Sequence, residues 1–292
     1  PIRGNQFETT FSENNGKMTA LKYGDREMIK AGLEPNFWRG LTDNDVANGT
    51  SQRCSIWKNA PKEARLQHID LKTNKENSEV TLTTDYFVNE NDMGWQTTYH
   101  IRPEGIIEVE QHFIPGNKPL PEMPRWGMRM ILPAEYDNVT WLGRGPQENY
   151  ADRKTGANIS RYTASVWQQY HPYVRAQETG NKCDVRWIAL QNKSGDGILV
   201  VGDKPLSVSA WNFMMDDICY RPSAIEHRHG GSIEKKDLVW FNIDHRQMGV
   251  GGDTTWGAQV HPEYTITPKE WKYRFTILPI NKNSDFSVLS FQ

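Results

Sequence analysis

The chain has 292 residues, of which 37% are hydrophobic and 24% are charged, and its formal net charge at pH 7 is -2. That length is sufficient for a large globular domain with a substantial core. Because the charge is nearly balanced and no apolar run is long enough to cross a bilayer, we expect neither a nucleic acid nor a membrane as partner.

Cysteine usage and the first residue give two further expectations. The three cysteines, Cys54, Cys183 and Cys219, lie far apart in the sequence. An odd number without close spacing disfavours both a disulfide framework and a zinc site. The sequence begins at Pro1 rather than Met, so we expect it to be a piece of a longer protein.

The dominant hydrophobic period along the chain is two residues, which is typical of β-strands. Segments rich in turn-forming residues separate short strands from one another. In chain order, these predicted turns lie at residues 14–16, 24–25, 103–105 and 194–197. Two later segments, 126–132 and 271–277, alternate strictly and place aromatic or large apolar side chains on one face.

Helical signals are scarce. The segment PKEARLQH, residues 61–68, is the nearest to an amphipathic helix, and it is short. No repeat or low-complexity linker divides the chain. We therefore predict an all-β protein, a large antiparallel sandwich over residues 1–292 as a single domain. The loop-rich segment 115–124 is the one alternative boundary.

The first loop rich in ligand-binding side chains is FWRGLTDNDVANG, residues 37–49, which contains Asp43, Asn44 and Asp45. Their oxygens are of the type that hard cations prefer. The other ligands of a calcium loop are missing, so we favour a role in capping backbone amides over a metal site.

The second such loop is WLGRGPQENYADRKTGA, residues 141–157. Its charged residues suggest a network around two glycines, Gly143 and Gly145. The four candidates are Arg144, Glu148, Asp152 and Arg153. We favour a crossover held by ion pairs and side-chain-to-backbone bonds over a ligand-binding role.

The third loop is HRQMGVGGDTTWGAQVHPEY, residues 245–264. Gly249 and Gly251 fit the start of a phosphate-binding pattern, but Thr254 stands where a third glycine is required, and no helix follows. We therefore reject nucleotide binding. Trp256 is predicted to lie on a glycine-rich loop, where it is a plausible platform for stacking on a sugar.

Other catalytic or metal signals are isolated. His227 and His229 have the spacing of a metal pair but lack a third ligand nearby. Neither the G-x-S-x-G nor the H-E-x-x-H motif occurs.

Taken in order, these three loops and YHPYVRAQETGNKCDVRW, residues 170–187, resemble one family. They are similar to the C-terminal domain, also called the small chain or fifth domain, of large bacterial β-galactosidases of glycoside hydrolase family 2. The resemblance runs from about residue 35 to the C-terminus. It implies a large antiparallel β-supersandwich like that of galactose mutarotase.

The resemblance also implies a role. In that family two glutamates of a separate (β/α)8 barrel carry out a retaining hydrolysis, so no catalytic residue is expected in this chain. Trp256 is expected to stack against the sugar at the active-site entrance. Asp43, Asn44 and Asp45 are expected to lead into a mobile active-site loop that begins near Val46, with Ala47 as its hinge.

Partners and cofactors follow from the same resemblance. The expected partner is a β-galactoside held together with the upstream barrel, in a parent enzyme that is a homo-oligomer. No cofactor or metal is expected in this domain, whereas the parent enzyme is expected to use Mg and Na ions. The compartment, bacterial cytoplasm or periplasm, stays open.

Two other functions compete with this interpretation. A free-standing aldose mutarotase requires a general acid and base in one cleft, for which His171, Glu148 and Glu178 are the candidates. However, the motifs of mutarotases are not visible, and a shared fold does not imply a shared function. The other alternative is a carbohydrate-binding module without chemistry.

Overall fold

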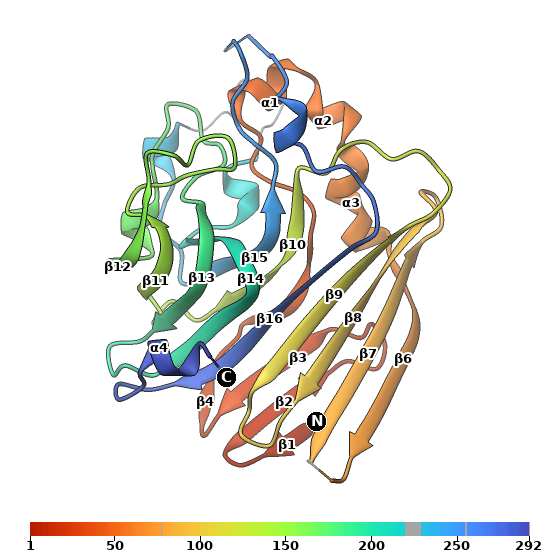
Figure 1. Cartoon of the computed structure of the whole chain (residues 1–292), viewed down its shortest axis with the longest axis vertical. Coiled ribbons are helices and arrows are strands. Elements are labelled where there is room, and N and C mark those ends of the chain that lie inside the picture. The colour runs from red at the N-terminus through yellow and green to blue at the C-terminus, as the bar shows by residue number, and fades with distance from the viewer. Residues whose placement is uncertain (77, 220–228, 255, 292) are drawn as a thin grey trace.

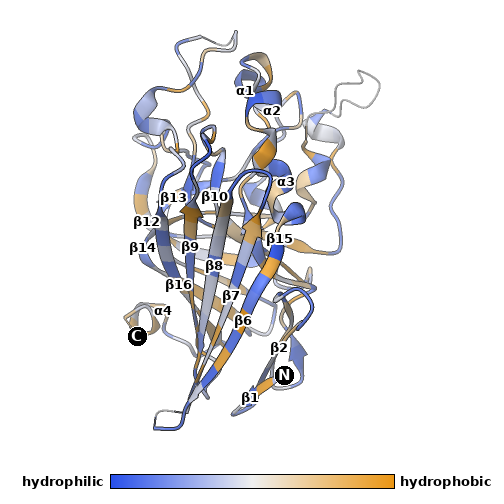
Figure 2. Cartoon of the chain, turned by 90° about the vertical axis from the view of Figure 1, so that its right-hand side faces the viewer, coloured by the Kyte–Doolittle hydropathy of each residue, from blue (hydrophilic) through white to orange (hydrophobic). Residues whose placement is uncertain are grey.

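The computed structural model describes residues 1–76, 78–219, 229–254 and 256–291, and antiparallel β-strands dominate it (Figure 1). A small sheet contains, in order, β1 (Ile2–Gly4), β2 (Phe7–Phe11), β3 (Met18–Tyr23) and β4 (Arg26–Glu27). It packs beside a much larger sheet, which curls across the molecule (Figures 1 and 2). The predicted all-β class is thus confirmed.

The large sheet has 12 strands in the described part of the chain and branches at β14 (Gly197–Trp211). Its main path runs in the order β12 (Asn158–Ser165), β11 (Asn138–Gly145), β13 (Lys182–Gln191), β14, β16 (Trp271–Ile280), β9 (Ile107–Pro115), β8 (Met93–Ile101), β7 (Glu79–Val88) and β6 (Arg65–Asn74). The branch consists of β15 (Val239–Gln247), β10 (Arg125–Leu132) and β5 (Ala31–Asn36).

The predicted turns and alternating strands agree with this topology. Residues 14–16 connect β2 to β3, 24–25 connect β3 to β4, 103–105 connect β8 to β9, and 194–197 lead from β13 into β14. The alternating segments 126–132 and 271–277 lie within β10 and β16. Period-two patterning and turn chemistry therefore located these elements correctly.

Residues 61–68, the nearest helical signal in the sequence, are only partly helical. Helix α3 (Ser55–Glu63) ends there, and β6 begins at Arg65. Pro61 lies in the last turn of α3, where its missing N–H removes one intrahelical hydrogen bond and weakens the end of the helix. From Arg65 onward, antiparallel pairing with β7 satisfies the backbone groups instead.

The segment 37–49 was predicted as a loop, but it contains a short helix, and residues 50–63 are also largely helical. Helices α1 (Asp43–Ala47), α2 (Thr50–Arg53) and α3 follow one another closely beside one end of the large sheet (Figure 1). A fourth short helix, α4 (Phe286–Leu289), lies near the C-terminus. In the described part of the chain, no helix has the length and apolar character needed to traverse a bilayer.

Most of the tryptophans lie in the core. In its centre Phe37 stacks on Trp126, with ring centroids 5.4 Å apart, and meets Trp57 edge-on at 6.0 Å. All eleven tryptophans are described; eight are buried, and Trp167 and Trp271 are half-buried. Trp256 alone among them is exposed, with 89% of its surface in solvent.

Candidate functional site

Strand direction brings the first and third of the predicted loops together. Both β5 and β15 pair antiparallel with β10, and Asn36 and Asp244 are opposite the same residue, Gly127. The two strands therefore run in the same direction and end at the same edge. The segments that follow them, 37–49 and 248–254, leave that edge side by side (Figure 1). We call the group of loops at this edge the loop end.

Arg39 ties these two segments to each other. Its guanidinium is fully buried and binds both carboxylate oxygens of Asp45, at 2.9 and 3.0 Å. It also donates to the carbonyl oxygens of Met248, at 2.5 Å, and Gly249, at 2.9 Å. A buried arginine with a bidentate carboxylate partner has fixed geometry, so the base of the third loop is held against the first.

The D-N-D motif has a mainly structural function in the described contacts. Thr42 caps α1, and Asp45 accepts in return from the Thr42 amide, which completes a capping box. Asp43 accepts from Arg175 at 2.7 Å and from Gln177 at 3.0 Å. The capping role favoured over a cation site therefore agrees with the structure.

The motif also reaches the loop that carries Trp256. Nδ2 of Asn44 donates to the carbonyl of Thr254 at 3.2 Å. Gly257, at φ +98°, packs so closely on Ala47 that an added Cβ would lie 2.8 Å from its carbonyl carbon. Ala47 and Val46, the proposed hinge and start of a mobile loop, both lie in α1. The foot of the Trp256 loop is thus fixed against this helix.

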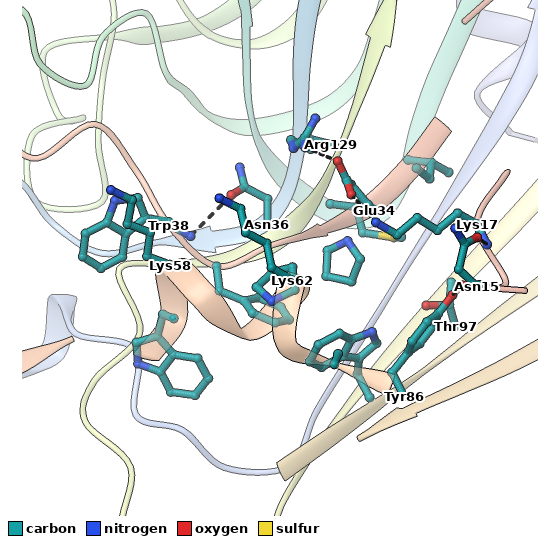
Figure 3. Close-up of a pocket in the computed structure, with 18 of the residues that line it drawn as sticks. Asn15, Lys17, Glu34, Asn36, Trp38, Lys58, Lys62, Tyr86, Thr97 and Arg129 are labelled. Atoms are coloured by element: carbon teal, nitrogen blue, oxygen red, sulfur yellow. Dashed lines mark hydrogen bonds and ion pairs between the residues drawn. The ribbon is translucent and has the colours of Figure 1, made fainter. Parts of the chain in front are cut away.

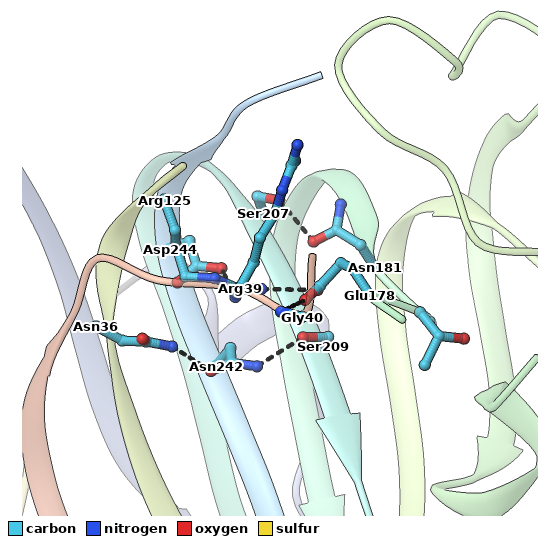
Figure 4. A network of polar contacts seen from close by, with 12 residues as sticks. Asn36, Arg39, Gly40, Arg125, Glu178, Asn181, Ser207, Ser209, Asn242 and Asp244 are labelled. Carbon is cyan, nitrogen blue, oxygen red and sulfur yellow. Dashed lines mark hydrogen bonds and ion pairs between the residues drawn. The ribbon is translucent and has the colours of Figure 1, made fainter. Parts of the chain in front are cut away.

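A second buried arginine connects the fourth motif. Arg125, at the start of β10, contacts Asp244 at 2.5 Å and Glu178 at 2.7 Å, and all three side chains are fully enclosed (Figure 4). Glu178 also accepts from the amide of Gly40 at 3.1 Å. This network fixes the segment 170–181 to the first loop.

The network contains two carboxylates but one guanidinium. Burial raises the pKa of Asp244 from 3.8 to about 8, although Arg125 acts in the opposite direction. We therefore place a proton on Asp244 at neutral pH. Uncharged side chains form hydrogen bonds next to this network (Figure 4). Asn36 donates to Asn242 at 3.0 Å, and Asn242 donates to Ser209 at 2.8 Å.

This proton gives a testable pH dependence. Between pH 4 and 8 the folded chain holds a proton on Asp244 that the unfolded chain releases, so this residue lowers stability as pH rises through that range. The contribution is on the order of 1 kcal/mol per pH unit. In Asp244→Asn this contribution is absent.

We expect the stability advantage of the wild type over Asp244→Asn to shrink from pH 5.5 to pH 8 in urea unfolding monitored by circular dichroism. An advantage that stays constant or grows with pH would contradict the assignment of the proton.

The charge network predicted in 141–157 is present in part, and it extends to residues outside this segment. Glu148 pairs with Arg153 at 2.7 Å and accepts from the amide of Gly180 at 2.8 Å. Asp152 accepts from the amides of Val250 and Gly251, at 3.0 and 2.7 Å, which joins the second loop to the third. Arg144 instead pairs with Asp184, at 2.5 Å, a residue that the sequence analysis did not single out.

Of the three mutarotase candidates, Glu148 and His171 line one surface pocket, whereas Glu178 lies outside it. Glu178 is enclosed with Arg125, and Glu148 is engaged by Arg153, Tyr173 and the Gly180 amide. His171 is exposed. Because both carboxylates serve as structural acceptors, the acid–base arrangement of a mutarotase is not supported.

The residues considered as metal ligands either have other contacts or lie outside the described part of the chain. His227 lies outside the described residues, and a ring nitrogen of His229 lies 3.0 Å from the carbonyl oxygen of Val174. Within the described residues, no group of three or more His, Cys, Asp or Glu side chains has the arrangement of a metal site. The oxygens of Asp43 and Asp45 already have cationic or amide partners.

The sequence alone did not reveal the buried ion pairs of Arg39 and Arg125. Arg39 and Arg125 are each adjacent to a tryptophan, in FWRG and PRWG; Arg39 follows β5, and Arg125 begins β10. A basic residue inside an apolar segment is a signal for a buried ion pair, since an isolated buried charge is strongly unfavourable. The partners themselves are distant in sequence and do not follow from it.

Comparisons with known proteins agree with this architecture. The sequence matches the family described as "Beta galactosidase small chain" over residues 3–277. The chain belongs to this family. Members with curated sequences include a β-galactosidase of Priestia megaterium, 34% identical over 96% of this chain, and one of Lactobacillus delbrueckii subsp. bulgaricus, 34% identical over 96%. The small-chain sequence spans 26% and 27% of these two proteins, respectively.

Solved structures support the expected fold. A GalM/aldose epimerase homologue from C. elegans aligns over 97% of this chain and 98% of its own, with a TM-score of 0.50 and 10% identity. A galactose 1-epimerase from Lactobacillus acidophilus NCFM aligns over 94% and 91%, also with a TM-score of 0.50 and 10% identity. At this identity the likeness concerns the fold alone, which is mutarotase-like.

Proposed function

We propose that this small-chain domain is the non-catalytic C-terminal part of a glycoside hydrolase family 2 β-galactosidase that hydrolyses terminal β-D-galactosides. In this proposal, the two catalytic glutamates and most contacts to the sugar belong to the rest of the protein. The small-chain domain contributes an aromatic wall to the active site, formed by Trp256, and helps to position the adjacent segment Asp43–Asn44–Asp45.

One observation carries the proposal. Ten tryptophans pack at least partly into the protein, while Trp256 exposes 89% of its surface on a loop whose base is held by buried polar contacts. A large exposed ring at a rigidly anchored position is typical of a binding surface. The apolar C–H face of a galactoside fits this ring.

Metals and assembly enter the proposal through the family resemblance. We assign the Mg and Na ions of the parent enzyme to residues outside this domain, since the oxygens of Asp43 and Asp45 are engaged by Arg175 and Arg39. The parent enzyme is proposed to be a homo-oligomer.

The direct test is Trp256→Ala in the complete protein. Loss of the stacking surface removes about 1 kcal/mol of substrate binding. If this binding is equal in the ground and transition states, KM rises several-fold and kcat changes less. Steady-state kinetics on a β-galactoside measures both values.

A matched control is Phe291→Ala, which removes another exposed aromatic side chain, 92% exposed, near the C-terminus. We expect its kinetics to equal those of the wild type. An unchanged KM in Trp256→Ala would overturn the role assigned to this ring.

The location of the catalytic part is tested by sequencing the gene upstream of the Pro1 codon. We expect a continuous reading frame of several hundred codons that encodes a barrel with two glutamates, or a separate subunit that supplies it. For the 292-residue chain alone, we expect galactose binding too weak to detect by tryptophan fluorescence. Binding well below millimolar would instead favour a carbohydrate-binding module.

A further inference from the structure

The pocket of about 610 Å³ between helix α3 and the large sheet presents no tryptophan face to a ligand (Figure 3). The tryptophans that line it are 0–4% exposed: Trp38, Trp57, Trp95 and Trp240. Trp256, which is 89% exposed, differs in this from the other ten. Stacking of a tryptophan on a sugar face therefore depends on what holds the loop that carries Trp256.

The Trp256 loop is closed at its base. The amide of Gly249 donates to the carbonyl oxygen of Tyr264 at 2.9 Å, so the two ends of the loop lie next to each other. Further along, an added Cβ on Gly252 would lie 2.6 Å from the carbonyl oxygen of Ala258. The two arms of the loop therefore run close together, as in an Ω-loop with joined ends.

A histidine and a carboxylate join the two arms on either side of the tryptophan. Nε2 of His261 lies 2.8 Å from Oδ1 of Asp253, and its Nδ1 lies 3.9 Å from Oε1 of Glu263. Among the described residues, these two carboxylates are the charged groups beside the imidazole. Because Asp253 precedes Trp256 and His261 follows it, the pair closes the loop around the exposed ring. We call this pair the clasp.

The clasp complements the contacts that attach the tip of the loop to α1. Asn44 donates to the carbonyl oxygen of Thr254, and Gly257 packs on Ala47. These contacts hold the tip against the helix, whereas the clasp holds one arm against the other. The two side chains of the clasp are 53% and 81% exposed. An ion pair this exposed contributes little to global stability, so its effect is confined to the loop.

The charge of the clasp changes near neutral pH. The hydrogen bond with Asp253, together with the charges of Asp253 and Glu263, raises the pKa of His261 above 6.5. Below this pKa the imidazolium pairs with the carboxylate, and above it the neutral ring keeps a hydrogen bond without the ionic attraction. The clasp is therefore strongest at low pH and weakens as the pH rises through the pKa of His261.

We propose that His261 and Asp253 are positioning residues for Trp256, and that protonation of His261 tightens the binding of the galactoside on which the ring stacks. This inference rests on the function proposed for Trp256. When the arms are joined, the ring is already in place. When they are apart, substrate binding must also order the loop, which costs conformational entropy. The clasp therefore acts on KM more than on kcat.

The pairing is tested first in the 292-residue chain, without substrate. The imidazole resonance of His261, assigned by its loss in His261→Gln, is followed by NMR between pH 5 and pH 8.5. We expect a pKa above 6.5 in the wild type and a lower pKa in Asp253→Asn. Equal pKa values in the two chains would show that the clasp does not form in solution and would overturn the proposal.

The effect on Trp256 is measured as KM of the complete protein for a β-galactoside between pH 5.5 and pH 8.5. Glutamine keeps a hydrogen bond like that of the neutral ring but has no charge. For His261→Gln we expect KM about two- to threefold above the wild type at pH 5.5, a ratio near one at pH 8.5, and similar kcat values. His261→Arg, which keeps the cation at every pH, is expected to hold the low KM up to pH 8.5.

His112 offers a matched control outside the Trp256 loop. Its Nε2 lies 2.8 Å from a carboxylate oxygen of Glu270, and His112→Gln is expected to leave KM at the wild-type value at each pH. A ratio for His261→Gln that is constant with pH, while Trp256→Ala raises KM, would overturn this inference alone. An unchanged KM in Trp256→Ala would overturn both this inference and the proposed function.

Discussion

Replacing Arg125 by alanine is expected to lower the free energy of unfolding by about 3–5 kcal/mol, the range for breaking a buried ion pair from one side. The side chains of Arg125, Glu178 and Asp244 have no exposed surface. Without the guanidinium, Glu178 retains a buried charge whose remaining described hydrogen bond comes from the Gly40 amide. The segment 170–181 then loses its main link to β10.

Urea unfolding monitored by circular dichroism measures this loss as a lower midpoint. Arg186→Ala is the control, because Arg186 is an exposed arginine on β13, where a change within about 0.5 kcal/mol is expected. In Arg125→Met/Glu178→Gln, both charges are removed together, and we expect part of the stability to return. A midpoint for Arg125→Ala no lower than that of Arg186→Ala would refute the role of the network.

Replacing Arg39 by alanine is expected to be of similar size, about 3–5 kcal/mol, and to loosen the loop end specifically. Asp45 loses its bidentate partner in a buried position, and the carbonyl groups of Met248 and Gly249 lose their donors. The connection between the cap of α1 and the base of the Trp256 loop is removed. In the complete protein, we expect KM to rise as it does in Trp256→Ala.

Hydrogen exchange gives a readout that a uniform loss of stability does not reproduce. We expect faster exchange in residues 42–54 and 248–254 of Arg39→Ala, under conditions where β7, β8 and β9 keep their protection. The control is Arg186→Ala, which removes an exposed arginine of β13 outside both segments and is expected to leave their exchange unchanged. If exchange became faster to the same extent across the whole chain, this would contradict the inference that Arg39 holds these two segments together locally.

Local physical chemistry explains why much of the β-structure was predictable. Alternation between Trp126 and Leu132 identified β10 because successive side chains of a strand face opposite sides of the sheet. Glycine and asparagine identified the turn at 14–16 because they tolerate left-handed backbone conformations, and Gly16 has φ +67°. Both signals act over a few residues, so they can be detected without knowledge of the fold.

Helical structure near residue 50 was less accessible to the same reasoning. Helices α1 and α2 have five and four residues, too short for a helical period to be visible. The capping box of Thr42 and Asp45 was the available signal, although its acidic partner is aspartate rather than the usual glutamate. Helix α3 contains Pro61, which obscured its end.

The position of Trp256 on a glycine-rich loop followed from the sequence, and so did the resemblance of four ordered motifs to one family. The sequence by itself thus determined the all-β class, many turns and strands, and the exposed character of this tryptophan, because these depend on neighbouring residues. Tertiary structure alone decided which loops meet. Arg39 lies 209 residues from Met248, and Arg125 lies 119 residues from Asp244. Such pairs are set by strand order and by the requirement that every buried charge find a partner, and neither condition is written in local sequence.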